Sequence, residues 1–110
     1  MKRYRIERHP LVESDLDAIQ DYIAPFAGVD VTLKIMRAIR HRIRELEYLP
    51  HIGTVRDEIM PNLRALPGAG KAVICFTVDD NAGIVKILCV TYAGQDWQKI
   101  AAEREKSDMM

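Results

Sequence analysis

Apolar residues recur at helical spacing through the first half of the chain. The first set, separated by steps of four, three, four and three residues, is Val12, Leu16, Ile19, Ile23 and Phe26. After Pro25 and Gly28 the same stepping returns in Leu33, Met36, Ile39, Ile43, Leu46 and Leu49, and Pro50 follows. Each set forms one stripe on a helix. Because the connection between them is short, the pattern predicts an antiparallel αα-hairpin.

The rest of the chain has the shorter period of β-strands. Residues 4–8 alternate apolar and polar side chains and are stopped by Pro10, which predicts a short N-terminal strand. Three β-rich runs between residues 63 and 92 are separated by glycine-bearing turns at 67–70 and 79–83. This arrangement predicts a three-stranded antiparallel meander, followed by a short helix from Trp97. The sequence therefore indicates an α+β fold, with all 110 residues in one domain.

The register of the meander assigns its side chains to two faces. If Asp79 pairs with Ile84, an apolar face contains Ile74, Phe76, Val78, Val85, Ile87 and Cys89, and this face takes the helical hairpin. The opposite face contains Lys71, Val73, Cys75, Thr77, Lys86, Leu88, Val90 and Tyr92, and pairing Leu66 with Lys71 adds Arg64. In this register the two cysteines point to opposite faces. We therefore expect small buried thiols and no disulfide.

The second, half-polar face is the candidate site. Its cations Arg64, Lys71 and Lys86, beside the phenol of Tyr92, could hold a phosphodiester or the acidic side chains of a protein partner. The alternative is that the lysines only keep the sheet soluble and Tyr92 covers the core with its hydroxyl in water. For a docked protein partner, the apolar floor of this face adds Val73, Cys75 and Leu88 to the expected contacts.

Charge and composition narrow the classes of partner. Sixteen basic and sixteen acidic residues cancel, so we expect no direct binding to nucleic acid or to an anionic membrane. The second helix is rich in cations between Lys34 and Arg44, but Glu45 and Glu47 follow, which favours a solvated helix face.

The three histidines have no ligand spacing, and no nucleotide-binding motif occurs, so we expect neither a metal nor a cofactor. No apolar run is long enough to span a membrane, which indicates a cytoplasmic protein.

Several short motifs, in order, resemble the ParE/RelE family of bacterial toxins. They are Asp15-Leu16-Asp17-Ala18-Ile19, Leu49-Pro50-His51-Ile52-Gly53, Leu63-Arg64 and Tyr92-Ala93-Gly94-Gln95-Asp96. The resemblance covers residues 4 to 100. It implies a type II toxin whose partner is a cognate antitoxin, ParD-like or of another class, with a C-terminal segment that wraps the toxin.

The resemblance also bears on the target. RelE-type ribonucleases have a basic residue just after the last strand and a tyrosine or histidine near the C-terminus, whereas residues 93–100 contain no Arg, His or Tyr. This departure favours the ParE side of the family, which is understood to poison DNA gyrase. It also favours inhibition by protein binding, with no reaction catalysed by the toxin. Two alternatives stay open. One is a ribosome-dependent mRNA endonuclease using Arg64, Lys71, Lys86 and Tyr92, and the other is a non-toxic module that only binds an antitoxin.

Overall fold

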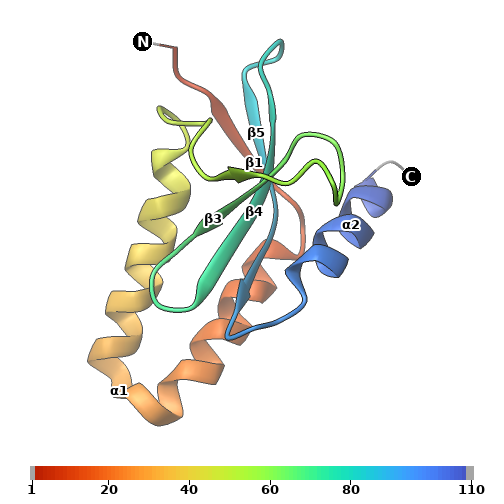
Figure 1. The fold of residues 1–110 in the computed structure, drawn as a ribbon. Coiled ribbons are helices and arrows are strands. Elements are labelled where there is room, and N and C mark those ends of the chain that lie inside the picture. Colours follow the sequence, from red (N-terminus) through yellow and green to blue (C-terminus); the bar gives the residue numbers. More distant parts are fainter. Residues whose placement is uncertain (1, 109–110) are drawn as a thin grey trace.

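The predicted α+β architecture is confirmed in a computed structural model, which describes residues 2–108 (Figure 1). Its strands are β1 (Arg5–Arg8), β2 (Thr54–Val55), β3 (Leu63–Pro67), β4 (Ala72–Asp79) and β5 (Ile84–Tyr92). They form one sheet in the order β1-β5-β4-β3-β2. β3, β4 and β5 make the expected antiparallel meander, while β1 runs parallel to β5 at one edge. β2 pairs with β3 at the other edge and was not predicted from the sequence.

The αα-hairpin corresponds to α1 (Val12–Glu45), which bends sharply into two arms (Figure 1). The bend is at Gly28, whose φ of 78° and ψ of 173° lie in a region that is nearly restricted to glycine. The hydroxyl of Thr32, one turn into the second arm, donates to the Gly28 carbonyl at 2.6 Å. No helix among residues 2–108 is both long and apolar enough to cross a membrane.

Most residues of the two predicted apolar stripes are buried, but three are not. Phe26 is 84% exposed, Leu33 is 41% exposed and Leu49 is 50% exposed. Phe26 and Leu33 flank the bend, where the hairpin extends beyond the sheet (Figure 1) and has no second layer to pack on. Leu49 follows the end of α1, where the helical period no longer applies.

Helices cover both faces of the sheet. The two arms of α1 pack on one face, and α2 (Trp97–Asp108) crosses the other (Figure 1). The core under α1 includes Leu16, Ile39, Ile43, Ile74, Phe76, Val85, Ile87 and Val90. The smaller core under α2 consists of Leu63, Cys75, Leu88, Cys89 and Ala101, with Trp97 and Ile100 partly buried against it. The face that the sequence analysis left open is therefore occupied by the protein's own C-terminal helix.

A β-bulge in β5 changes the predicted assignment of side chains to faces. Asp79 does pair with Ile84, and Phe76 pairs with Ile87, but Cys75 pairs with Cys89, so Leu88 is an extra residue. From this point the alternation of β5 is reversed. Val90 and Tyr92 lie on the α1 face and Cys89 lies on the α2 face, opposite to the predictions for all three.

The bulge also brings the two cysteines together. Cys75 and Cys89 are direct partners across the ladder on one face, so the prediction of opposite faces was wrong. Both are free and buried, as expected. The contact with the Cys89 thiol and burial raise the pKa of Cys75, which keeps its thiol protonated.

The backbone of the bulge is held by an ion pair between the two helices. Asp15 of α1 accepts a hydrogen bond from the amide of Val90 at 3.0 Å. Arg104 of α2 donates to the Leu88 carbonyl at 3.0 Å and binds Asp15 through both of its terminal nitrogens. The side chains of Asp15 and Arg104 are each only 14% exposed. The hydrogen bond to Asp15 raises the pKa of Arg104. One cluster thus joins α1, β5 and α2.

We predict that Arg104→Ala lowers the free energy of unfolding by about 3 kcal/mol, because Asp15 would lose its counter-ion in a nearly buried place. Urea denaturation followed by Trp97 fluorescence measures the change. Lys106→Ala, at an exposed position of the same helix, is the control and should alter stability by less than about 0.5 kcal/mol. Equal stability of the two variants would contradict a central role for the ion pair.

Candidate functional site

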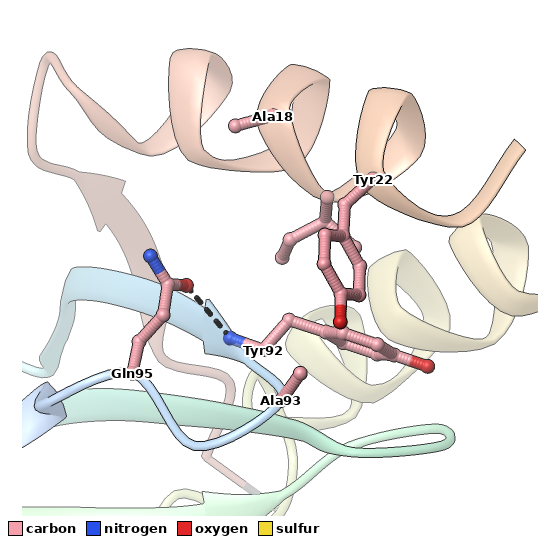
Figure 2. Close-up of a pocket in the computed structure, with 6 residues that line it drawn as sticks. Ala18, Tyr22, Tyr92, Ala93 and Gln95 are labelled. Carbon is pink, nitrogen blue, oxygen red and sulfur yellow. Dashed lines mark hydrogen bonds between the residues drawn. The ribbon is translucent and has the colours of Figure 1, made fainter. Parts of the chain in front are cut away.

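An apolar cleft lies where the end of β5 meets the first arm of α1 (Figure 2). Its volume is about 300 Å³, and it is lined by Ala18, Ile19, Tyr22, Tyr92, Ala93 and Gln95. The rings of Tyr22 and Tyr92 meet edge to face, with 6.0 Å between their centroids. Tyr92 reaches this position because the bulge directs it toward α1. The side-chain oxygen of Gln95 accepts a hydrogen bond from the Tyr92 amide at 2.9 Å and holds the turn after β5 in place.

Exposed apolar side chains extend from the cleft along the bend of the hairpin. We call Tyr22, Phe26, Val29 and Leu33 the hairpin-tip patch. Their exposed fractions are 56%, 84%, 72% and 41%, in that order. The ring centroids of Tyr22 and Phe26 are 6.2 Å apart. Grouped exposure of large apolar residues beside an apolar cleft is typical of a surface that binds another protein. The sequence analysis missed this patch because it assigned Phe26 and Leu33 to the apolar stripes without separating them from the residues that pack on the sheet.

The four residues proposed for phosphodiester chemistry are not brought together. Tyr92 lies on the α1 face, whereas Lys86 pairs with Thr77 on the α2 face. The two are six residues apart along β5, or about 20 Å. Lys71 lies in the turn before β4 and lines a different cleft, of about 400 Å³, with Val73, Thr91 and Trp97.

Arg64 lies apart from these three residues. Because Arg64 pairs with Phe76 it lies on the α1 face of β3, where its guanidinium donates to the His51 carbonyl at 2.9 Å. The predicted pairing of Leu66 with Lys71 was also wrong, since Leu66 pairs with Ile74.

The apolar residues expected to contact a protein partner lie on the α2 face. Cys75 and Leu88 have no exposed surface, because they pack with Ala101 in the core under α2. Val73 is partly buried against the same core. This part of the predicted surface is therefore covered in the isolated chain.

A polar cluster near the opposite end of the sheet was not predicted. The Tyr4 hydroxyl donates to a carboxylate oxygen of Asp80 at 2.7 Å, and the imidazole nitrogen Nε2 of His51 lies 2.7 Å from the same oxygen. The hydrogen bond from Tyr4 makes the largest contribution to lowering the pKa of Asp80, and the one to His51 lowers it further. The same hydrogen bond to Asp80 raises the pKa of Tyr4. The three residues are far apart in the sequence and match no local motif, so only the folded chain shows the cluster.

His51 and Asp80 also line a cavity of about 260 Å³ together with Asp57, Asn62 and Arg64. Two carboxylates, those of Asp57 and Asp80, offset the positive charge of Arg64, so the cavity has no net attraction for a phosphate. Among residues 2–108 no three histidine, cysteine or acidic side chains are grouped closely enough to hold a metal ion.

Comparison with known proteins places this fold in a family. The model of the family described as "ParE toxin of type II toxin-antitoxin system, parDE" matches residues 6–97. The fold, a helical hairpin against a twisted sheet with an exposed apolar tip, is thus that of a bacterial toxin domain. The chain belongs to the ParE toxin family of type II toxin-antitoxin systems. Comparison with curated protein sequences gave no match.

Solved structures of low sequence identity share the fold. The chromosomal ParDE toxin-antitoxin system of Pseudomonas aeruginosa aligns with a TM-score of 0.70 at 21% identity, over 86% of this chain and 100% of that chain. A mutant of the Escherichia coli toxin RelE in the free state aligns with a TM-score of 0.64 at 13% identity, over 94% of this chain and 97% of that chain. The RelBE2 toxin-antitoxin complex of Mycobacterium tuberculosis aligns with a TM-score of 0.64 at 16% identity, over 84% of this chain and 94% of that chain.

The lowered pKa of Asp80 predicts a loss of stability in acid. The unfolded chain takes up a proton on this carboxyl at a higher pH than the folded chain. The contribution of Asp80 is therefore present above about pH 4 and is lost as the pH falls through the folded pKa. Urea titrations between pH 2.5 and 6 should show a smaller decline for Asp80→Asn than for the wild type.

Asp21→Asn is the matched control. Asp21 is exposed and has no hydrogen bond or ion pair within the part of the chain that the structure describes. Its variant should follow the wild-type curve. The account of the polar cluster fails if the Asp80→Asn and Asp21→Asn curves coincide.

Proposed function

We propose that this chain is the toxin of a toxin-antitoxin pair and inhibits growth by poisoning DNA gyrase. The proposed mechanism is protein binding, without a cofactor and without a reaction catalysed by the toxin. The observation that carries this proposal is the hairpin-tip patch with its adjoining cleft, an exposed apolar surface of the kind that docks on proteins. Lys86 and Arg64 lie far from Tyr92 along the sheet, and Lys71 lines a different cleft from Tyr92. This arrangement also favours binding over RNA cleavage, since cleavage requires acid, base and phosphate-binding groups at one place.

The second part of the proposal is neutralisation by a cognate antitoxin, ParD-like or of another class. Two of the similar structures are toxin-antitoxin assemblies, ParDE and RelBE2. On this chain, the cleft between Tyr22 and Tyr92 has room for a large apolar side chain, and the hairpin-tip patch can cover the apolar side of a helix. A flexible antitoxin segment that folds on this surface would bury residues that are otherwise exposed to water.

An mRNA endonuclease is the second candidate, and one observation favours it. Arg64 lines the same cavity as His51, whose ring is oriented by the carboxylate of Asp80. An imidazole held in this way can act as a general base, and a guanidinium can bind a phosphate oxygen. This candidate would use Arg64 and His51, in place of the set of Arg64, Lys71, Lys86 and Tyr92 expected from the sequence.

Purified, antitoxin-free protein added to gyrase separates these possibilities. The proposal predicts loss of supercoiling and accumulation of trapped double-strand DNA breaks, with heat-denatured toxin as the inactive control. His51→Ala should poison gyrase as well as the wild type does. If gyrase is unaffected while the protein arrests growth and cuts mRNA, and His51→Ala stops both, the endonuclease replaces the proposal. Normal growth without antitoxin would identify a non-toxic binding module.

Antitoxin binding should depend on the hairpin-tip patch. Phe26→Asp places a charge at the most exposed large apolar residue, and we expect it to weaken antitoxin binding by about 30-fold or more, the effect typical of an interface hot spot. Isothermal titration calorimetry with the purified antitoxin measures the change. Leu11→Asp is the matched control, because Leu11 is 49% exposed but precedes the other end of the first arm. Equal loss of affinity in both variants would argue against the patch.

A further inference from the structure

A line of cations runs along the outer side of the second arm of α1. Lys34, Arg37, His41 and Arg44, which we call the basic row, are separated by three, four and three residues. This spacing places them on one side of the helix over a length of about 15 Å. All four are exposed, whereas Met36, Ile39 and Ile43 on the other side of the same helix are buried.

Most of the basic row has no acidic partner within the protein. Among residues 2–108, His41 pairs with Glu45 at 3.3 Å, but Lys34, Arg37 and Arg44 make no ion pair. The neighbouring arginines differ in this respect. Arg40 binds Glu13 of the first arm at 2.8 Å, and Arg42 binds Glu45 at 3.2 Å. The fold therefore uses Arg40 and Arg42 internally and leaves the basic row available to a partner.

An acidic row on the first arm limits the width of that partner. Asp17 and Asp21 follow Glu13 at intervals of four residues, so they continue the side of the first arm that Arg40 contacts. A nucleic-acid duplex is about twice as wide as a helix and carries phosphates on both strands, so it would bring negative charge against Asp17 and Asp21. A single acidic helix, about 10 Å in diameter, can lie along the basic row alone.

The end of the basic row adjoins the hairpin-tip patch. Leu33, a member of the patch, directly precedes Lys34, and Val29 lies one turn before Leu33. A partner that lies along the second arm therefore meets apolar side chains at the bend and cations beyond it. A phosphate backbone has no apolar groups that could cover this patch, whereas an amphipathic protein helix can cover it with its apolar side.

We propose that the basic row binds an acidic, amphipathic helical segment of the antitoxin, with its apolar residues on the hairpin-tip patch. This inference rests on the proposed pairing with an antitoxin and does not depend on gyrase as the target. Exposed ion pairs contribute little affinity individually, because both charges are well solvated. Their larger effect is on association, since a row of like charge attracts an oppositely charged segment before contact. The basic row should therefore control how fast the antitoxin binds.

The test is the association rate of the toxin with the antitoxin encoded beside its gene, measured by stopped-flow fluorescence. In 50 mM salt we expect Arg37→Glu/Arg44→Glu to slow association by about tenfold or more, and in 500 mM salt the difference should shrink to about twofold. Lys99→Glu/Lys106→Glu is the matched control. It makes the same change of charge at two exposed positions of α2 and should stay within about twofold of the wild type at both salt concentrations. Circular dichroism confirms that both variants are folded.

Three results would overturn the inference. The first is an unchanged association rate in Arg37→Glu/Arg44→Glu, and the second is an equal decrease in both double variants. The third is binding of a 20-base-pair DNA duplex that is lost in Arg37→Glu/Arg44→Glu, with antitoxin association intact, which would make the row a nucleic-acid site.

The gyrase assay without antitoxin keeps this inference separate from the proposed function. Arg37→Glu/Arg44→Glu should poison gyrase as the wild type does, and its loss of poisoning with normal antitoxin association would assign the row to the target. If the wild type itself does not act on gyrase, the proposed target fails while the association rates still decide the role of the basic row.

Discussion

The bulge at Leu88 in β5, together with the ion pair that holds it, determines which side chains each face of the sheet presents. An extra residue in one strand reverses the alternation of everything that follows. Tyr92 consequently points toward α1 and forms the cleft with Tyr22 instead of lying beside Lys71 and Lys86. Asp15 and Arg104 bind the amide and carbonyl groups of the bulge, so α1 and α2 are fixed to the same point of the sheet.

The two layers of helix differ in how far they extend beyond the sheet. Under α2, Cys75 and Leu88 are fully enclosed, whereas α1 extends past the strands and leaves Phe26 and Val29 in water. Exposing large apolar groups is unfavourable, and natural monomers seldom group them unless the surface has a partner. Opposite charges are also separated on the arms of the hairpin, with Asp17 and Asp21 on the first and Arg37 and Arg44 on the second. Apolar contact and electrostatic attraction are thus both concentrated on α1.

The elements of the fold could be predicted from the sequence because each has a strong local period. The stripe that includes Leu16 and Ile43, the break at Gly28 and the glycine-bearing turns of the meander all depend on neighbours along the chain. The candidate site could not be predicted in the same way. A bulge leaves no mark in an apolar run such as Ile87-Leu88-Cys89, and one extra residue was enough to misplace Tyr92.

Long-range contacts account for the rest of what the sequence did not show. The cluster of Tyr4, His51 and Asp80 joins three segments that are distant in the chain. Periodicity also cannot tell where a helix extends beyond its sheet, so Phe26 was assigned to the same stripe as residues that are buried. The family resemblance was carried by motifs that shape the fold, which is why it predicted the architecture.

Amide hydrogen exchange of the toxin, alone and saturated with antitoxin, tests most directly that α1 is the docking surface. The account predicts protection in residues 18–45 and at the turn after β5, at residues 93–95, with little change around His51 and Arg64. Protection confined to the cavity lined by His51, Arg64 and Asp80, with no change along α1, would contradict it.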